Sequence, residues 1–338
     1  MKAIGYTIPG SIDAPQALVD IDLPMPKAAG HDLLVEVKAI AANPVDTKVR
    51  KSSAPTEGEY KVLGYDAVGV VTAVGDQVSL FQVGDEVWYA GDITRSGSNA
   101  EYQLVDERIV GHKPKSLSFA DAAALPLTGI TAWELLFDRL QLPQDGSATD
   151  ARVLIIGAAG GVGSIITQLA SKLTGATVIG TASRAQTADW VKELGADVVI
   201  NHHQPLSQEL AKQQIADVTH VISLTHTDQH FDEIVEILRP QGKIALIDDP
   251  KEPLDIMKLK RKSLSLHWEL MFTRSMFQTQ DMIKQHQLLD TLAELVDAGK
   301  IKTTVGEHYG QINAANLIRA HKTSETNTTI GKMVLEGF

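Results

Sequence analysis

The fold is decided by residues 152–163, which read Arg-Val-Leu-Ile-Ile-Gly-Ala-Ala-Gly-Gly-Val-Gly. The β-branched, apolar run at 152–156 predicts a buried strand, and the glycines after it predict a tight turn into a helix. Small residues let a pyrophosphate approach the backbone, and the helix N-terminus supplies N–H groups and a positive dipole end. Ala158 stands where the usual pattern has its first glycine. The strand–turn–helix context therefore predicts a dinucleotide site formed by Ala159, Gly160, Gly161, Val162 and Gly163.

The sequence around this turn alternates between short apolar runs and helix-like segments. The predicted strands are 152–156, 178–179, 198–200, 220–224 and 243–247, and the predicted helices are 163–173, 185–194 and 230–238. Such alternation is typical of a doubly wound parallel sheet with helices on both faces. The polar stretch 144–150 is expected to be the exposed loop before the first of these strands.

The first third of the chain has a different pattern. Short predicted strands at 2–6, 32–40, 67–74 and 86–89 are separated by glycine turns at 74–76 and 83–85, which favours a partly closed barrel. The last third contains a predicted strand at 263–268 and a helix at 280–298, and then returns to strand-like sequence that ends with 330–335. A terminal strand of this kind is expected to close onto the first domain. We therefore predict a discontinuous domain of residues 1–126 and 271–338, and a second domain of residues 127–270.

The end of the second sheet strand bears on the choice of cofactor. An enzyme that uses NAD usually has Asp or Glu there, to accept hydrogen bonds from the ribose hydroxyls. Here the strand ends in Thr181-Ala182-Ser183-Arg184, and the next carboxylate is Asp189, inside the following helix. Ser183 and Arg184 are suited to bind a 2′-phosphate, which favours NADPH over NADH. The alternative is that Arg184 is only a solvated residue of the first helical turn.

Composition excludes several classes of function. A net charge of −11 disfavours nucleic acid and anionic membrane surfaces as partners. The chain has no cysteine, which excludes disulfides, thiolate metal sites and thiol nucleophiles. Neither a signal-peptide pattern nor an apolar stretch of about 18 residues is present, so we expect a cytoplasmic protein.

A series of short motifs follows in order along the chain: Ala42–Asp46 with Arg50, Leu63–Asp66, Val83–Val87, Leu125–Gly129, the 158–163 turn and Glu193–Asp197. With these motifs the chain resembles the zeta-crystallin-like quinone oxidoreductases of the medium-chain dehydrogenase/reductase superfamily. It is most similar to the bacterial branch labelled zinc-type alcohol dehydrogenase-like. The resemblance spans essentially the whole chain.

The resemblance implies a GroES-like barrel domain, a six-stranded Rossmann domain and a cofactor in the cleft between them. It implies transfer of hydride from NADPH to a small-molecule electron acceptor such as a quinone, an enone or an enal. It further places Asn43 near the nicotinamide, Thr128 near the phosphates or nicotinamide ribose, and Leu224 and Thr225 beside that ribose. Asn201 and His202 fall near the adenosine end.

Other residues keep two interpretations each. Asp46 is a candidate catalytic residue, but its spacing from Arg50 favours an (i, i+4) ion pair on a helix. Tyr65 is a candidate proton donor to a developing oxyanion, or else a packed aromatic. Lys332 either reaches the cofactor or is a solvated strand lysine. Asn43 is also a candidate for the catalytic group.

Zinc is not expected. Asn43 falls in the region of the first zinc ligand of the metal-dependent relatives, and Gly64-Tyr65-Asp66 replaces their Gly-His-Glu motif. Zinc needs three protein ligands, and Asp66 alone does not supply them. The pairs His202/His203 and His226/His230 are more typical of surface or core histidines.

The segment 266–277 is rich in methionine and aromatic residues, which suits an acceptor pocket, a subunit surface or plain core packing. In relatives the sixth Rossmann strand pairs between subunits, so the resemblance implies a homodimer through 263–268. Three functions remain open at this point. They are a zinc-free NADPH-dependent reductase, an alcohol dehydrogenase with non-standard metal ligands, and an NADPH-binding protein without turnover.

Overall fold

The computed structural model describes all 338 residues and divides the chain into two compact units. Unit 1 comprises Met1–Ile130 and Phe272–Phe338, and unit 2 comprises Thr131–Met271. The predicted boundaries at 126/127 and 270/271 lie four residues and one residue from these divisions. No helix in the chain is both long enough and apolar enough to cross a lipid bilayer.

Unit 2 is built on a six-stranded sheet with the order β11-β10-β9-β12-β13-β14, in which every neighbouring pair is parallel. The strands are β9 (Arg152–Ile156), β10 (Thr177–Thr181), β11 (Val198–Ile200), β12 (Val218–Ser223), β13 (Leu238–Leu246) and β14 (Ser265–Trp268). The order reverses between β9 and β12, which is the switch point of a doubly wound sheet. The predicted fold class of this unit is confirmed, although β13 begins five residues before the predicted strand.

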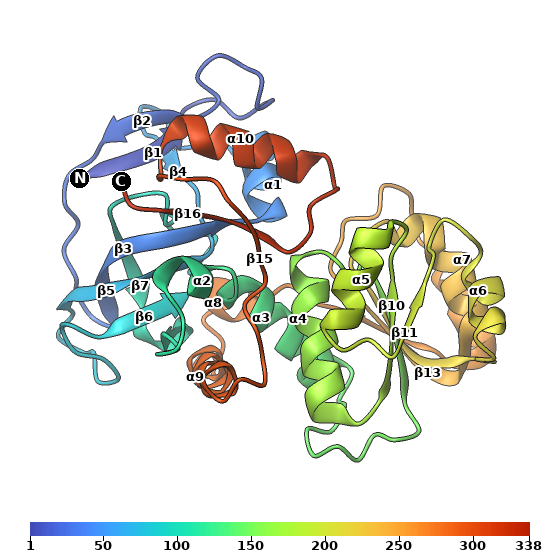
Figure 1. Cartoon of the computed structure of the whole chain (residues 1–338). Helices are drawn as coiled ribbons and strands as arrows, with labels where there is room; N and C mark the ends of the chain where they lie inside the picture. Colours follow the sequence, from blue (N-terminus) through green and yellow to red (C-terminus); the bar gives the residue numbers. More distant parts are fainter. The chain divides into compact units, whose positions relative to one another are not determined.

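Helices cover both faces of this sheet. Figure 1 shows α4 (Gly161–Leu169) and α5 (Ala185–Glu193) on one side, and α6 (Leu206–Lys212) and α7 (Thr227–Ile237) on the other. Because both faces are covered, the strands bury large apolar side chains along their length: Leu154, Ile179 and Ile244 are all fully buried. The core between the sheet and α6 and α7 includes Leu206, Leu210, Val221, Phe231, Ile234 and Ile237.

Unit 1 contains two sheets. The larger has the order β15-β16-β3-β5-β6-β8, with β7 also paired to β3, and the smaller has the order β2-β1-β4. The strands are β1 (Lys2–Tyr6), β2 (Val19–Asp22), β3 (Asp32–Ala42), β4 (Lys61–Val62), β5 (Ala67–Val74), β6 (Glu86–Tyr89), β7 (Tyr102–Asp106), β8 (Val110–His112), β15 (Val305–His308) and β16 (Lys332–Glu336). This arrangement agrees with the predicted GroES-like, partly closed barrel.

The helices of unit 1 pack around the larger sheet. They are α1 (Pro44–Ser52), α2 (Phe119–Ala123), α3 (Pro126–Trp133, which runs across the boundary), α8 (Thr273–Phe277), α9 (Lys284–Asp297) and α10 (Ala314–Glu325). The expectation of strand-like sequence throughout 299–335 is wrong for 314–325. The buried stripe of α10 has Leu317 as its only large apolar residue, and its other members are small or polar: Ala314, Ala320, His321 and Ser324. The hydrophobic signal in the sequence is therefore weak. The Asn313 side chain caps the helix by accepting the N–H of Asn316 (2.9 Å).

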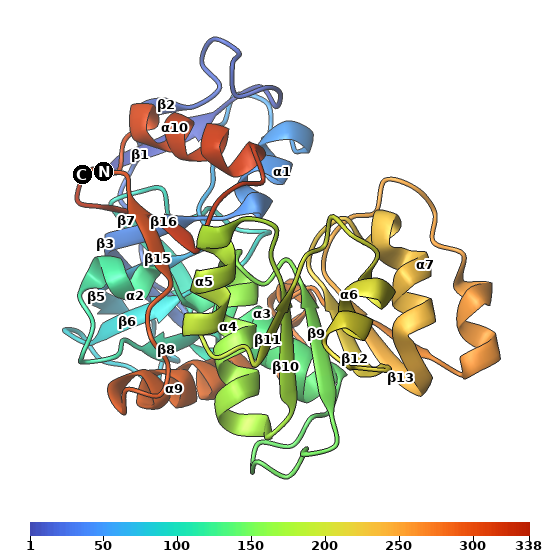
Figure 2. The same ribbon diagram turned by 45° about the vertical axis from the view of Figure 1, so that its right-hand side comes forward.

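The last strand returns to the first domain, as predicted. β16 pairs antiparallel with β3, with Met333 opposite Ala42 and Leu335 opposite Ile40. Figures 1 and 2 show both chain termini at the same end of unit 1, beside β1 and α10. This pairing matters for the site below, because it brings a lysine from the C-terminal strand to the end of β3.

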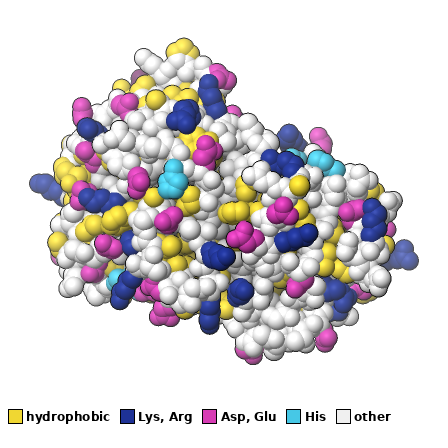
Figure 3. Space-filling view, viewed as in Figure 1, with side chains coloured by type: hydrophobic (Ala, Val, Ile, Leu, Met, Phe, Trp, Pro, Cys, Tyr) yellow, Lys and Arg dark blue, Asp and Glu magenta, His cyan; other side chains and the backbone are white.

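Charged side chains are mixed over the face drawn in Figure 3, where acidic and basic groups alternate and no continuous basic patch is present. This view fits the net charge of −11.

Candidate active site

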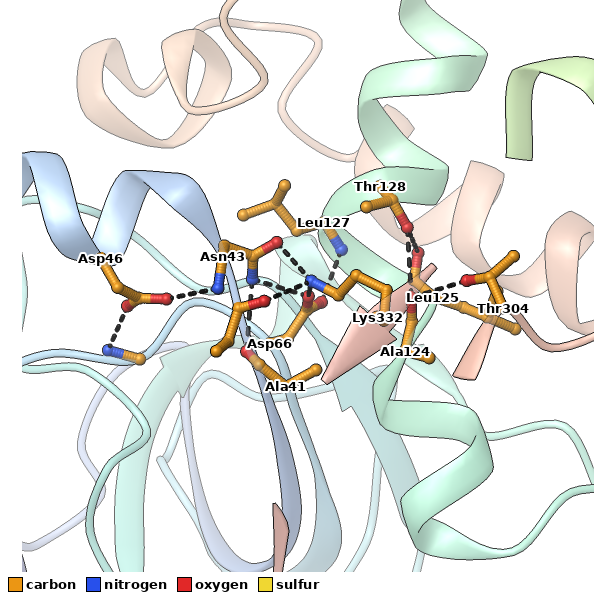
Figure 4. A network of polar contacts seen from close by, with 12 residues as sticks. Ala41, Asn43, Asp46, Asp66, Ala124, Leu125, Leu127, Thr128, Thr304 and Lys332 are labelled. Atoms are coloured by element: carbon orange, nitrogen blue, oxygen red, sulfur yellow. Dashed lines mark hydrogen bonds and ion pairs between the residues drawn. The ribbon is translucent and has the colours of Figure 1, made fainter. Parts of the chain in front are cut away.

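A buried polar cluster in unit 1 joins three segments that are far apart in the sequence (Figure 4). Asn43 directly follows β3, Asp66 directly precedes β5, and Lys332 begins β16. The Lys332 Nζ donates to Asp66 Oδ2 (2.8 Å), to the carbonyl of Ala42 (3.0 Å) and to Asn43 Oδ1. These contacts use all three ammonium N–H groups. The three side chains that form this cluster, Asn43, Asp66 and Lys332, are each at least 96% buried.

The remaining polar atoms of the cluster also have partners. Asn43 Nδ2 donates to Asp66 Oδ2 (2.8 Å) and to the carbonyl of Ala41 (3.3 Å). Asp66 Oδ1 accepts the backbone N–H of Leu127 at 2.7 Å, which ties the cluster to the start of α3. Burial raises the pKa of Asp66, and the Lys332 ammonium is the largest influence in the opposite direction. The cluster is thus a buried ion pair whose hydrogen bonds are satisfied internally.

Asp46 lies beside the cluster at the first turn of α1. Its carboxylate accepts the backbone N–H groups of Asn43 (2.8 Å) and Gly64 (3.1 Å). Burial raises the pKa of Asp46 to about 7, against the smaller lowering effects of those hydrogen bonds and of Lys332. Asp46 therefore fixes the backbone on both sides of the cluster, at Asn43 and at Gly64.

The predicted ion pair between Asp46 and Arg50 is absent. Arg50 instead donates to the carbonyl of Gly10, to Glu325 and to His321 Nδ1 (3.3 Å), and its side chain is 1% exposed. The helical spacing was correct, but Asp46 is held at the N-terminus of α1 by backbone donors, while Arg50 turns toward α10. The interaction of the two side chains was overridden by tertiary contacts that spacing alone does not reveal.

Tyr65 lies between Gly64 and Asp66 and has no hydrogen-bond partner for its hydroxyl, although the residue is fully buried. Its ring meets the edge of Phe272, with centroids 5.4 Å apart at 72°. Burial raises the pKa of Tyr65 well above the usual range of a phenol, so the hydroxyl keeps its proton. A buried O–H without an acceptor is costly, so this hydroxyl is an exception that calls for an explanation in structure or function.

Thr128 also belongs to unit 1, on α3. Its hydroxyl donates to the carbonyls of Ala124 and Leu125, at 3.2 Å each, and the side chain is buried. Figure 4 shows these bonds on α3, next to the Leu127 amide that reaches Asp66.

The glycine turn of unit 2 has the geometry of a dinucleotide turn. Gly157 has φ of +86°, and Gly160 is the N-cap of α4 with no side-chain cap of its own. A Cβ on Gly163 would lie 2.4 Å from the Gly157 carbonyl oxygen, so this glycine is needed for close packing of helix and strand. A Cβ on Gly160 would meet only that same oxygen, at 3.5 Å. The open side of the turn, at Gly160, is where a pyrophosphate can approach the backbone.

The other predicted cofactor residues of unit 2 lie at the same carboxyl edge of the sheet. Leu224 follows β12, and its N–H donates to the carbonyl of Ile156 (3.2 Å). A Cβ on Gly157 would lie 3.1 Å from the Thr225 side chain, so Thr225 borders the turn. Ser183 and Arg184 follow β10, and Asn201 and His202 follow β11. Unit 2 therefore gathers the candidate residues 159–163, 183–184, 201–202 and 224–225 along one edge, whereas Asn43, Asp46, Tyr65, Thr128 and Lys332 belong to unit 1.

Sequence reasoning missed the central role of Asp66, which it treated only as an inadequate zinc ligand. An acidic residue at a strand start, between Tyr65 and the apolar run of β5, is a signal for a buried and therefore paired carboxylate. The partner Lys332 lies 266 residues away, and only the pairing of β16 with β3 identifies it.

Comparison with known proteins places the chain in a family. Residues 29–115 match the alcohol dehydrogenase GroES-like domain, and residues 194–335 match the zinc-binding dehydrogenase model. A zinc-type alcohol dehydrogenase-like protein of Staphylococcus epidermidis is 41% identical over 336 residues, which is 99% of each chain. A 2-methylene-furan-3-one reductase of Solanum lycopersicum is 30% identical over 346 residues, covering 99% of this chain and 79% of that protein.

Solved structures of dehydrogenases and quinone oxidoreductases are also similar to this chain. A putative zinc-dependent alcohol dehydrogenase from Rhizobium etli is 54% identical with a TM-score of 0.95, and covers 100% of this chain and 98% of that one. The Escherichia coli quinone oxidoreductase complexed with NADPH is 26% identical, with a TM-score of 0.84. The match covers 99% of this chain and 100% of that chain.

A GroES-like domain joined to a doubly wound sheet with this glycine turn defines a nicotinamide-dependent dehydrogenase. The chain belongs to the medium-chain dehydrogenase/reductase superfamily, in its zinc-type alcohol dehydrogenase-like branch, and is an oxidoreductase of that family.

The family name implies zinc, but the residues of this chain do not fit the metal. No group of three or more His, Asp or Glu side chains is arranged to hold a metal ion. At the polar cluster, Asn43 and Asp66 already bind a cation of the chain itself, the Lys332 ammonium. An amide, one carboxylate and an ammonium are not a zinc donor set.

Proposed function

We propose that the protein is an NADPH-dependent reductase that transfers hydride to a quinone or a conjugated enone or enal without zinc. The observation that carries the proposal is the position of the Lys332 ammonium, which donates to the side-chain oxygen atoms of Asn43 and Asp66. The positive charge of Lys332 balances the negative charge of Asp66, so the cluster needs no metal cation. Among the proteins with similar sequence or structure are an enone reductase and a quinone oxidoreductase complexed with NADPH.

The cofactor half of the proposal rests on the carboxyl edge of the sheet in unit 2. Residues Ala159 to Gly163 would hold the pyrophosphate, and Ser183 and Arg184 would hold the 2′-phosphate. Asn201 and His202 would lie at the adenosine, and Leu224 and Thr225 at the ribose of the nicotinamide. Bound NADPH supplies the hydride.

For unit 1, we propose that Asn43, Thr128 and Lys332 serve the nicotinamide end. Because the three N–H groups of Lys332 and both of Asn43 Nδ2 are engaged within the protein, their role is to fix geometry. The Asn43 Oδ1 retains a second lone pair that can accept a hydrogen bond. Asp46 positions Asn43 through its backbone N–H.

The acceptor half of the proposal rests on Tyr65. Without a Lewis acid, a plain alcohol or ketone lacks the polarisation that metal-dependent enzymes give it. A quinone or conjugated carbonyl delocalises the incoming electron pair onto its oxygen, where one hydrogen-bond donor is sufficient help. The Tyr65 hydroxyl is protonated and has no internal partner, so it is suited to donate to that oxygen.

The proposal is tested by following NADPH oxidation with phenanthrenequinone, benzoquinone and a simple enal, beside NADH and beside a plain ketone. We expect turnover of at least one conjugated acceptor, a clear preference for NADPH and no turnover of the ketone. Preference for NADH with a plain alcohol or ketone would overturn the proposal. Tight NADPH binding without turnover of any acceptor would favour the non-enzymatic alternative.

The role of Tyr65 is tested by Tyr65→Phe, with Tyr89→Phe as the matched control, because Tyr89 is also a buried tyrosine whose hydroxyl has no partner. Loss of one hydrogen bond to the developing oxyanion is expected to lower kcat by about 10²-fold or more for Tyr65→Phe, with NADPH affinity unchanged. Tyr89→Phe is expected to leave kcat within about twofold. Equal effects of the two substitutions would contradict a direct role for Tyr65.

We also propose that the protein forms a homodimer through β14. This strand is the last of the sheet and pairs only with β13. Trp268, the last residue of β14, is 55% exposed, and Leu270, two residues further on, is 50% exposed. Such exposure is unusual for large apolar side chains at a free strand edge.

A further inference from the structure

The half-buried carboxylate of Asp248 caps the start of helix α7. The backbone N–H of Thr227, the first residue of α7, donates to Asp248 Oδ2 (2.9 Å), and the Thr227 hydroxyl donates to Oδ1. His226 stands at the N-cap position and provides no side-chain cap of its own. Asp248 comes from another segment, two residues after the end of β13. A carboxylate at this position satisfies an unpaired helix donor and complements the helix dipole.

Hydrogen bonds continue from this carboxylate to the end of β12. Ser223 is the last residue of β12, and its Oγ lies 2.7 Å from Thr227 Oγ1. Both residues are fully buried. Because the Thr227 hydroxyl gives its one hydrogen to the Asp248 carboxylate, Ser223 must be the donor in its contact with Thr227. The side chains of Ser223, Thr227 and Asp248 thus form one directed chain of hydrogen bonds, which we call the Asp248 cap.

The Asp248 cap holds one end of the loop Leu224–His226, which joins β12 to α7. The other end is held by β9, because the N–H of Leu224 donates to the carbonyl of Ile156 (3.2 Å). In the sheet, β12 lies between β9 and β13 (Figure 2). The loop is therefore fixed by both neighbouring strands, β9 at its start and the segment after β13 at its end.

The loop contains a backbone conformation that its sequence does not favour. His226 has φ of +52° and ψ of +37°, which is the left-handed region that residues other than glycine rarely adopt. Within the loop, His226 Nδ1 lies 2.7 Å from Thr225 Oγ1. Such a conformation persists where the surrounding structure fixes the chain on both sides. Here the fixed points are the Leu224 N–H and the Asp248 cap.

The helices α4 and α7, which begin on either side of the switch point, differ at their N-termini. Gly160, the N-cap of α4, has no side chain with which to cap the helix, and we have proposed a pyrophosphate there. The start of α7 already holds the carboxylate of Asp248, so it is closed to an anion. Its contribution is the loop before it, in which Thr225 would lie 3.1 Å from a Cβ on Gly157. The Asp248 cap therefore fixes a loop that borders the glycine turn.

We infer that Asp248 is a positioning residue for the nicotinamide half of the cofactor. Through Thr227 it keeps the loop Leu224–His226 in the conformation that receives the nicotinamide ribose. The inference rests on the proposed function and deepens it, because it adds a residue that acts on the cofactor through another part of the chain.

Loss of the carboxylate changes how often the loop is ready to bind. Without Asp248 the N–H and hydroxyl of Thr227 lose their acceptor, and His226 is no longer held in its left-handed conformation. The loop then relaxes into conformations that the free chain prefers. A smaller population of the binding-competent loop weakens the apparent affinity for any ligand that needs it, and leaves other ligands unaffected.

The test compares NADPH with adenosine 2′,5′-bisphosphate, which lacks the nicotinamide ribose, in calorimetric titrations of the full-length Asp248→Ala variant. If about a tenth of the molecules keep the loop in place, the Kd of NADPH rises about tenfold, and that of the bisphosphate stays within about twofold. In turnover of a conjugated acceptor, the KM of NADPH is expected to rise by a similar factor. At saturating NADPH, kcat is expected to fall by less than about threefold, because the bound cofactor restores the loop.

Two further variants separate positioning from stability. In Asp248→Asn the amide oxygen still accepts the N–H of Thr227, and the amide N–H can donate to its hydroxyl, which then donates to Ser223. This conservative variant is expected to keep NADPH affinity within about threefold of the wild type. Asp255→Ala is the matched control, because Asp255 also caps a helix of unit 2, accepting the N–H of Met257 (3.0 Å). It is expected to bind NADPH as the wild type does.

The outcomes separate the inference from the proposed function. Unchanged NADPH affinity in Asp248→Ala, or equal losses for NADPH and the bisphosphate, would overturn the inference and leave the proposed function intact. A lower kcat with an unchanged KM would also overturn it, because that result indicates a smaller fraction of folded enzyme. A wild type that turns over no conjugated acceptor would overturn the proposed function, and the two affinities would still decide the inference. A wild type that does not bind NADPH would overturn both.

Discussion

At the scale of single residues, unit 1 is organised around charges that are buried and fully hydrogen-bonded. Asp66 accepts three donors from three different segments, and Lys332 donates to three oxygen atoms. Such a network costs desolvation but specifies one arrangement of β3, β5, α3 and β16. Its members are therefore expected to respond strongly to single substitutions.

Replacing Lys332 by methionine leaves the Asp66 carboxylate buried without its cation. We expect a loss of about 3–5 kcal/mol in the free energy of unfolding of unit 1, measured by denaturant titration. The double variant Lys332→Met with Asp66→Asn removes both charges and should recover a large part of that loss. A double variant as unstable as the sum of the two single variants would show that the ion pair is not coupled.

The raised pKa of Asp46 should be visible in how the free energy of unfolding depends on pH. Because its pKa is raised in the folded state to about 7, from an unfolded value near 4, the folded state binds a proton more tightly. The contribution of Asp46 to the free energy of unfolding therefore falls as pH rises from about 4 to about 7, by up to about 1.4 kcal/mol per pH unit. Above about pH 7 this contribution no longer changes. Relative to Asp46→Asn, the wild type should lose stability over this range.

Trp88 allows unit 1 to be followed separately in this measurement, since the other tryptophans, Trp133, Trp190 and Trp268, belong to unit 2 and can be replaced by phenylalanine. A difference between wild type and variant that is flat from pH 4 to pH 8 would contradict the raised pKa.

At this scale the sequence identified candidate residues, but it did not predict their contacts well. The family resemblance named Asn43, Tyr65 and Lys332 as candidates, and the structure brings Asn43 and Lys332 into contact. The alternative of a solvated Lys332 is wrong, because this residue is 4% exposed. The roles of the three residues toward cofactor and acceptor stay predictions. The contacts of Asp46 and Arg50 were predicted wrongly, because local helical spacing does not show that Asn43 and Gly64 offer backbone donors or that Glu325 is near.

At the scale of elements, the turn between β9 and α4 contains glycines that are needed for two different reasons. Gly163 is required for packing, since a Cβ there would overlap the Gly157 carbonyl and Ala158, whereas a Cβ on Gly160 would make only an ordinary contact, at 3.5 Å, with the Gly157 carbonyl oxygen. This distinction was not visible in the sequence, where both are simply glycines of one motif.

The two glycines should therefore give different variants. Gly163→Ala is expected to lower the stability of unit 2 by about 1–3 kcal/mol through overpacking. Gly160→Ala should cost less than about 1 kcal/mol, because φ at this N-cap is −73°, yet weaken dinucleotide binding about tenfold or more by placing a methyl group where the pyrophosphate approaches. Thermal melting and nucleotide titration measure the two effects. Similar binding losses, with stability unchanged in both variants, would contradict the assignment.

Elements with strong periodicity were predicted well. β5, β6, β9 and β11 have the bounds expected from their apolar runs. Helix α10 was missed because its buried face contains alanine, histidine and serine, and the pairing of β16 with β3 was only anticipated in outline. Register between strands hundreds of residues apart depends on tertiary packing, which one sequence does not display.

At the scale of the whole molecule, the proposed dimer rests on the free edge of β14. Trp268→Lys adds a charge at that edge and is expected to convert a dimer into a monomer. Tyr60→Lys, at an exposed aromatic residue of unit 1, is the control and should remain dimeric. Light scattering coupled to size exclusion measures the mass. A monomeric wild type, or an unchanged dimer in Trp268→Lys, would contradict the proposal.

The measurement that tests the central claim most directly is turnover of a conjugated acceptor with NADPH before and after removal of metal by a strong chelator. Zinc content is determined on the same samples, and zinc is then added back. Since Asn43 and Asp66 hold Lys332 and no three metal-ligating side chains converge, we expect the same kcat in the metal-free and zinc-restored enzyme. Activity that disappears with the metal and returns with stoichiometric zinc would contradict the account.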